Sequence, residues 1–181
     1  FFEYIGKEFA DAKIKPFITL FGGEPLMNSK AHREIIEHIV HKSIEEGYEL
    51  SAVTNGYDFV EYIDLLKQAK IKEIQFTLDG TQPIRDQRRM TAGHKGTFDR
   101  VIAGMEQAVA HGIPINLRTV TDKQNIDDLV NLAELLDQKG WLPGFYTYTS
   151  FANTNLDTGA LAAYPFWVAD YRGYVGFQGS Y

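Results

Sequence analysis

The chain has 181 residues, of which 44% are hydrophobic, 13% aromatic and 23% charged, and its formal net charge is −6 at pH 7. This length corresponds to about one domain with a hydrophobic core, and the composition excludes a disordered chain. The acidic balance argues against a nucleic-acid partner, which requires clustered basic residues. The sequence has no apolar run of the ~18–20 residues that span a membrane and no signal peptide, so we expect a cytoplasmic protein without a membrane partner.

The sequence contains no cysteine, which excludes disulfides, thiolate zinc sites, a cysteine nucleophile and iron–sulfur ligation by this chain. Among its five histidines, His38 and His41 lie three residues apart in a predicted helix. Because Glu34, Glu37 and Lys42 flank them, we interpret this helix face as solvated and predict no metal site.

Short apolar runs alternate with amphipathic segments along the chain. Apolar residues at helical spacing predict helices that end at Gly47, Gly112 and Gly140, and short apolar runs before turn residues predict strands. An opening helix is predicted over 2–12, and later helices over 28–46, 59–69, 97–111 and 125–139. The predicted strands cover 15–21, 48–54, 73–78, 114–120, 145–149 and 164–171.

Alternating units of this size indicate βαβ crossovers and a parallel sheet. We therefore predict an α/β fold, a partial (β/α)6 barrel-like parallel sheet related to the TIM barrel but short of the ~250 residues of a complete one. A doubly wound open sheet is the main alternative, although no Gly-x-Gly-x-x-Gly follows any predicted strand. Because an open sheet leaves unpaired edges, we also expect self-association.

Polar residues follow four of the predicted strands. These strand ends are Gly22-Gly23-Glu24-Pro25, Thr54-Asn55-Gly56, Thr77-Leu78-Asp79-Gly80 and Asn116-Leu117-Arg118. Gln75, Thr77 and Asp79 also share one face by strand alternation. Since a strand buried between two layers of helices is apolar on both faces, this polar face predicts a solvated cavity. Any one of these turns alone is ordinary, but successive polar strand ends predict a site at the carboxyl edge of the sheet.

Five segments of the chain resemble the motifs of a known family. They are Thr19-Leu-Phe-Gly-Gly-Glu-Pro-Leu26, Thr54-Asn-Gly56, Thr77-Leu-Asp-Gly80, Asp86-Gln-Arg-Arg89 and Gly96-Thr-Phe-Asp-Arg-Val101. In order and spacing they resemble the radical SAM superfamily over residues 1–142, and in particular its branch of anaerobic sulfatase-maturating enzymes and peptide-modifying SPASM proteins. The resemblance implies a partial β/α barrel that binds S-adenosylmethionine beside a 4Fe–4S cluster, with a peptide as candidate substrate.

The resemblance also implies which residues hold S-adenosylmethionine. Gly22, Gly23 and Glu24 would contact the ammonium group of its methionine part, because a carboxylate and an oriented loop suit that cation. Thr77 stands where the family usually has Ser and would contact the same ligand. Thr54 belongs to the same predicted cofactor-binding set.

The remaining predicted site residues lie later in each motif or on the fourth strand. By resemblance, Arg89 or Arg118 would pair with the carboxylate of the methionine part, and Asn116 would reach the ribose. Asn55 and Asp79 would mainly shape the loops. Arg89 also belongs to a short basic cluster, Arg85, Arg88 and Arg89, in the predicted loop after residue 80. This cluster has two open interpretations, namely surface charge or a cation that faces a carboxylate or phosphate at the cavity mouth.

One departure from the family is severe. The family holds its cluster on a Cys-x3-Cys-x2-Cys loop after the first strand, and this chain has neither that strand nor a cysteine. The cysteine-rich SPASM extension is missing too. Because the cluster carries the difficult chemistry, we expect a domain fragment that retains part of the S-adenosylmethionine pocket and is inactive as this chain.

The end of the chain resembles a different family. Residues 143–157 and 163–171 resemble late strands of glycoside hydrolase family 25 lysozymes, so we predict radical SAM-like units over 1–142 and lysozyme-like units over 143–181 that complete the same domain. Tyr146, Tyr148 and Trp167 are candidates to stack on sugars, although strand aromatics more often belong to a core. No Asp-x-Glu occurs, and no glycosidase pair of carboxylates can be assembled. The alternatives are therefore a cell-wall glycan hydrolase or binder, and a non-catalytic hybrid or designed β/α scaffold.

Overall fold

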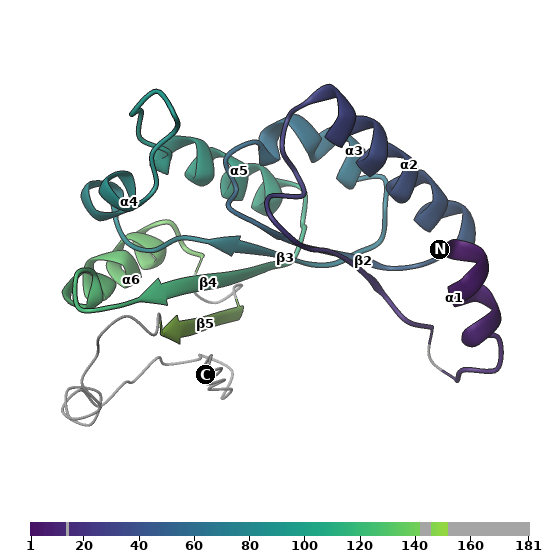
Figure 1. Cartoon of the computed structure of the whole chain (residues 1–181). Coiled ribbons are helices and arrows are strands. Elements are labelled where there is room, and N and C mark those ends of the chain that lie inside the picture. The colour runs from purple at the N-terminus through teal and green to yellow at the C-terminus, as the bar shows by residue number, and fades with distance from the viewer. Residues whose placement is uncertain (14, 142–145, 152–181) are drawn as a thin grey trace.

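The structure is a computed structural model, and it describes residues 1–13, 15–141 and 146–151. Its centre is one sheet of five parallel strands in the order β1-β2-β3-β4-β5 (Figure 1). These strands are β1 (Ile18–Leu20), β2 (Leu50–Thr54), β3 (Ile71–Thr77), β4 (Ile115–Thr121) and β5 (Tyr146–Phe151). The strand predicted over 164–171, and most of the lysozyme-like segment, lie outside the described residues.

One helix precedes the first strand, and the others lie in the connections between strands. They are α1 (Phe2–Glu8), α2 (Lys30–Glu46), α3 (Ile63–Leu66), α4 (Gln82–Arg88), α5 (Phe98–Ala110) and α6 (Leu129–Gln138), with 3-10 turns η1 (Phe59–Tyr62) and η2 (Ile126–Asp128) before α3 and α6. The helix predicted over 59–69 is therefore a 3-10 turn followed by one helical turn, and the opening helix ends at Glu8 instead of residue 12.

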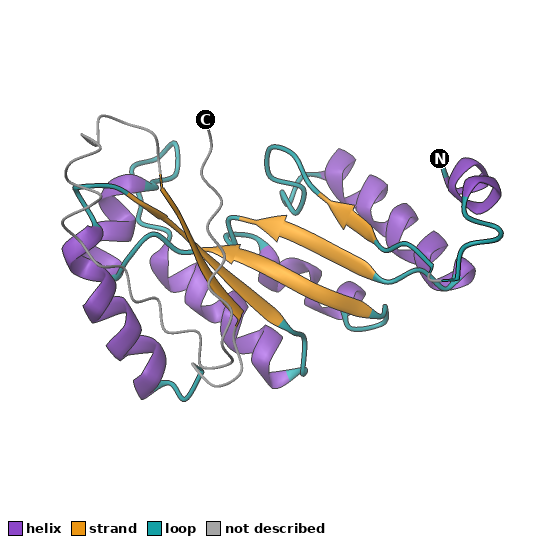
Figure 2. Ribbon diagram, turned by 90° about the horizontal axis from the view of Figure 1, so that it is seen from below, coloured by secondary structure: helices purple, strands orange, loops and turns teal. Residues whose placement is uncertain are grey.

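The strand order confirms the barrel-like prediction over the doubly wound alternative. A doubly wound sheet reverses its strand order at a switch point and carries helices on both faces. Here each strand lies beside the next one in the sequence, so right-handed crossovers place successive helices on the same side of the sheet. Figure 1 shows α2, α3 and α5 along one side, and Figure 2 shows the strands running in one general direction.

The hydrophobic core lies between the sheet and these helices. In β3, Ile74 and Phe76 are fully buried on the helix side, and Phe76 meets Phe59 edge to face at 4.8 Å between ring centroids. Val101 and Met105 of α5 are fully buried in the same core. The opposite face of β3 carries half-buried Gln75 and, at the strand end, Thr77. Because alternation sends apolar side chains to the helices, it leaves polar ones on the inner face of the partial barrel.

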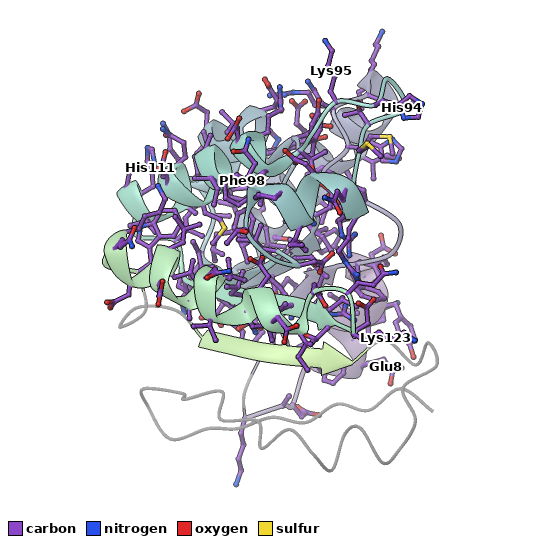
Figure 3. The ribbon with its side chains drawn as sticks, turned by 90° about the vertical axis from the view of Figure 1, so that its left-hand side faces the viewer. Glu8, His94, Lys95, Phe98, His111 and Lys123 are labelled. Carbon is purple, nitrogen blue, oxygen red and sulfur yellow. The ribbon has the colours of Figure 1, made fainter. Side chains whose placement is uncertain are left out.

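Helix α4 corrects the sequence analysis, which treated the residues after Gly80 as a loop. It begins after Thr81, in extended conformation, and has Pro83 in its first turn, where a missing N–H is tolerated. Asp86 of α4 accepts hydrogen bonds from the Thr97 and Phe98 amides at 2.7 and 2.9 Å, which ties α4 to the start of α5. Figure 3 shows His94 and Lys95 at the tip of the loop between the two helices.

Candidate functional site

A cavity of about 320 Å³ opens where β1 to β4 end, and we call it the edge cavity. Its lining residues are Phe21, Gly22, Gly23, Glu24, Val53, Thr54, Asn55, Thr77, Arg89, Arg118 and Val120. Eight of the ten residues predicted from the sequence are among them, and Asp79 and Asn116 are not. The parallel register places Thr77 directly beside Arg118, so residues from distant motifs meet at one edge of the sheet.

The loop after β1 brings its backbone to the edge cavity. Gly22 and Gly23 have φ angles of 105° and 57°, in the left-handed region that residues with a Cβ rarely adopt. A Cβ built on either residue would meet no atom within 4 Å, so the backbone conformation, and not crowding, requires glycine here. The two glycines thus turn the chain sharply between β1 and Glu24.

Glu24 joins the first two loops of the site. Its carboxylate accepts hydrogen bonds from the Thr54 hydroxyl and the Asn55 amide, both at 2.6 Å, and from the Leu26 amide at 3.0 Å. Thr54 in turn accepts a hydrogen bond from the Gly56 amide at 3.0 Å. A carboxylate has about four acceptor positions, so these three bonds fix its orientation and leave capacity for a further donor.

Asn55 and Asp79 connect the loops of the site through hydrogen bonds. Asn55 accepts a hydrogen bond from the Tyr57 amide at 2.8 Å on its side chain and one from Arg85 at 3.0 Å on its carbonyl. Asp79 is 1% exposed; it accepts from the Val120 amide at 3.1 Å and pairs with Arg89 Nε at 2.5 Å. Because β3 ends at Thr77, the strand alternation that predicted a shared face for Thr77 and Asp79 does not extend to Asp79.

Asn116, the predicted ribose contact, does not line the edge cavity. It is beside Gln75 in the register of β3 and β4, and its amide donates to Glu73 at 3.4 Å. Its side-chain oxygen is buried and has no hydrogen-bond partner among the described residues. The ribose contact of Asn116 therefore stays a prediction without support from the cavity lining.

The basic cluster is not simple surface charge. Arg85 is 1% exposed, whereas Arg88 pairs with Asp122 at 2.8 Å and Arg89 pairs with Asp79. Burial, and secondly the nearby charge of Arg89, lowers the pKa of Arg85 from its ordinary value to about 10. Sequence reasoning missed this buried position because an arginine among charged neighbours is usually exposed.

Among the described residues, no group of three or more His, Asp or Glu side chains is placed to hold a metal ion, and His38 and His41 are exposed. No helix in the same part of the chain has the length and apolar character needed to cross a membrane.

Comparisons with known proteins place the chain in a family. A family model described as the radical SAM superfamily matches residues 2–136. The chain is 31% identical over 125 residues to a GTP 3',8-cyclase of Nautilia profundicola, covering 68% of this chain and 37% of the cyclase. It is 32% identical over 124 residues to the PqqA peptide cyclase of Ruegeria pomeroyi, covering 68% and 31%. The chain thus spans about a third of the length of these curated relatives.

Solved structures share the fold. SuiB of Streptococcus suis, bound to S-adenosylmethionine, superposes with a TM-score of 0.65 at 16% identity over 99% of this chain and 41% of SuiB. Native anSMEcpe with bound AdoMet superposes with a TM-score of 0.60 at 18% identity over 82% of this chain and 40% of that protein. At such identities the likeness concerns the fold alone, a TIM-barrel-like one. The family match, in contrast, covers well over half of the sequence, and the chain belongs to the radical SAM superfamily.

Proposed function

We propose that the edge cavity binds S-adenosylmethionine and that this chain is the cofactor-binding part of a radical SAM protein. The observation that supports this most directly is the meeting of Glu24, Thr77 and Arg118 around one cavity, although they come from three motifs far apart in the sequence. A second support is the family itself, whose members use S-adenosylmethionine and a 4Fe–4S cluster.

The charges of the cavity match the amino-acid end of the cofactor. That end carries an ammonium and a carboxylate, and the edge cavity offers the carboxylate of Glu24 and the guanidinium groups of Arg89 and Arg118. The spare acceptor capacity of Glu24 and the backbone of the Gly22-Gly23 turn suit the ammonium. Thr77, a residue that is 7% exposed, adds an uncharged hydroxyl contact to the same ligand.

Asp79 prepares Arg89 for this role. The Asp79 carboxylate takes the Nε donor of Arg89, which fixes the plane of the guanidinium and leaves its terminal nitrogens for a ligand carboxylate in fork geometry. Arg85 and the Val120 amide hold Asp79 in turn, at 3.7 and 3.1 Å. The site is thereby organised before the ligand arrives, which reduces the loss of side-chain freedom on binding.

The residues do not fit the other cofactor of the family. Iron–sulfur clusters in this family need thiolates, and the sequence contains no cysteine. Any thiolate ligands must therefore lie outside these 181 residues, and what this chain contributes is binding and orientation. For the whole protein that contains this chain, we propose a peptide substrate. This substrate class is supported by the likeness to PqqA peptide cyclase and to the structure of anSMEcpe with AdoMet and the Kp18Cys peptide.

The test is isothermal titration of the chain with S-adenosylmethionine, together with its melting curve. We expect saturable binding and a raised melting temperature, because a ligand that binds only the folded state stabilises it. Arg118→Met should weaken binding, whereas Arg33→Met, on the outer helix α2, should leave it unchanged. Absence of binding heat with an unchanged melting curve would overturn the proposal and leave the scaffold hypothesis.

Self-association and a glycan-hydrolase activity are two further proposals. Self-association is supported by β1, which pairs only with β2 in the described sheet and is flanked by exposed Phe17 and Phe21. A monomeric sedimentation profile at high concentration would contradict it. The glycan-hydrolase hypothesis and the boundary at residue 142 depend on the end of the chain, where the structure describes only the backbone of 146–151; clearing of a cell-wall suspension tests that hypothesis.

A further inference from the structure

A second cavity of about 430 Å³ lies beside the edge cavity, and we call it the α4 cavity. Its wall includes all three arginines of the basic cluster, Arg85, Arg88 and Arg89. The two cavities share Glu24, Asn55 and Arg89 as a common wall. A volume of this size is within the range of small-molecule sites, ~300–1,000 Å³.

Buried donors without partners are concentrated at this cavity. Five buried side-chain polar atoms lack a hydrogen-bond partner among the described residues. Three of them are arginine nitrogens of α4, namely Nε and Nη1 of Arg85 and Nε of Arg88. Native proteins satisfy nearly all such groups, and the exceptions commonly mark a missing water, ion or ligand. The other two atoms, in Asn116 and Thr121, belong to β4 and not to this cavity.

The charge balance points the same way. Arg85 and Arg89 share one buried carboxylate, that of Asp79, at 3.7 and 2.5 Å, while the charge of Arg88 is matched by Asp122. Within 4 Å, the two guanidinium groups thus share one carboxylate among the described residues, and the charge of Asp86 acts on Arg85 from farther away. With its pKa still near 10, Arg85 remains protonated at neutral pH.

The acidic residues of the wall, Glu24 and Asp58, form no ion pair with Arg85 or Arg89 among the described residues, and other donors orient their carboxylates. Glu24 is held by Thr54, Asn55 and Leu26. Asp58 accepts from the Asn28 amide at 2.9 Å and from Arg100 at 3.4 Å.

We propose that the α4 cavity binds the oxyanion group, a carboxylate or a phosphate, of a second ligand distinct from S-adenosylmethionine. Arg85 and Arg88, whose nitrogens without hydrogen bonds are buried, would shift their guanidinium groups to donate to it. Planar guanidinium groups match the oxygens of carboxylate and phosphate. Met27, Tyr57 and Met90 line the same cavity and give an organic ligand an apolar surface. The inference does not depend on the edge cavity being occupied.

The experiment titrates the full chain with inorganic phosphate and, separately, with succinate, both in the absence of S-adenosylmethionine. We expect saturable binding of at least one anion, and the stronger of the two identifies the source of the oxyanion. Arg85→Met should weaken that binding roughly 10- to 100-fold through loss of a charged donor. Its melting temperature should fall, because the hydrogen bond to the Asn55 carbonyl and the ion pair with Asp79 are lost, so binding is measured well below the unfolding transition. Arg33→Met is the matched control and should bind as the unaltered chain does.

Three results would overturn the proposal: binding of neither anion, unchanged binding by Arg85→Met, or displacement of the anion by S-adenosylmethionine mole for mole. The last would make the α4 cavity part of the cofactor site. Should Arg85→Met fail to fold, Arg88→Lys decides, because it keeps a positive charge opposite Asp122 and replaces the planar guanidinium donors, Nε included, with one ammonium group. Weaker anion binding by Arg88→Lys supports the proposal, and unchanged binding overturns it.

Discussion

The two cavities at the carboxyl edge of the sheet share a wall but differ in how their charges are matched. In the edge cavity, Glu24 and Arg89 each have partners that hold them in place, and their remaining capacity faces the cavity. In the α4 cavity, Arg85 is buried with two nitrogens unpartnered among the described residues. The comparison separates a proposed zwitterion site, whose charged groups are already held in place, from a cavity whose wall contains buried arginine nitrogens without hydrogen bonds among the described residues.

Asp79 connects the two cavities, so its replacement should have the largest effect. Asp79→Asn keeps an acceptor for the Val120 amide but leaves Arg85 and Arg89 without a counter-charge. We expect a loss of about 3–5 kcal/mol in the free energy of unfolding, as for other broken buried pairs, measured by urea denaturation. Asp64→Asn is the control, because Asp64 is 83% exposed and pairs only with Lys67. A loss equal to that of the control would show that the two cavities are not linked through Asp79.

Glu24 tests the edge cavity alone. Glu24→Gln removes the negative charge that the ammonium group of S-adenosylmethionine would contact, while the side chain keeps its length. We expect binding to weaken by roughly 1.5–3 kcal/mol by isothermal titration, the range for a hydrogen bond to a charged group. Glu37→Gln, on α2 and paired with Arg33, should leave the affinity unchanged. If the affinity of Glu24→Gln also stays unchanged, the Gly-Gly-Glu loop is only a turn.

Two threonines on neighbouring strands give a sharper contrast. Thr77 lines the edge cavity, whereas Thr119 is buried and donates to the Leu78 carbonyl at 3.0 Å. Thr77→Val should lower the affinity for S-adenosylmethionine by about 0.5–1.5 kcal/mol without lowering stability. Thr119→Val should lower the free energy of unfolding by a similar amount without changing affinity. Titration and denaturation of both variants check the pair, and the reverse pattern would contradict the assignment of Thr77.

The sequence was sufficient to predict most of the edge cavity, for a physical reason. Parallel strands end at the same edge, so polar residues after successive strands converge there, as Thr77 and Arg118 do. Asn116 shows the limit of this reasoning. It shares a strand face with Arg118, but two residues along a strand are about 7 Å, which places it below the edge. The alternation predicts the face of a side chain and not its depth.

The α4 cavity was beyond sequence reasoning. Helix α4 has seven residues, fewer than two full turns, so helical spacing gives almost no signal. Arg85 sits among charged neighbours, and nothing local distinguishes a buried arginine from an exposed one. Its burial follows from contacts with Asn55, which is 30 residues away in the sequence, and with Asp79, which precedes the helix. Long-range packing therefore decides the position on which the second cavity depends.

The smallest expected effect concerns Asp122, the ion-pair partner of Arg88. Burial of Asp122 tends to raise its pKa, but the hydrogen bond from Arg88, those from the Gln124 and Asn125 backbone, and the Arg88 charge outweigh it and leave the pKa lowered from 3.8. A carboxyl with a lowered folded-state pKa stabilises the protein above its unfolded pKa, and this stabilisation is lost as the pH falls through the folded value. Asp122→Asn should therefore lower the free energy of unfolding at pH 7 by about 1 kcal/mol or less, and the difference from the unaltered chain should shrink below pH 4. Denaturation at several pH values measures it. A difference that persists at low pH would mean that Asp122 acts through packing, and that the charge of Arg88 is not matched there.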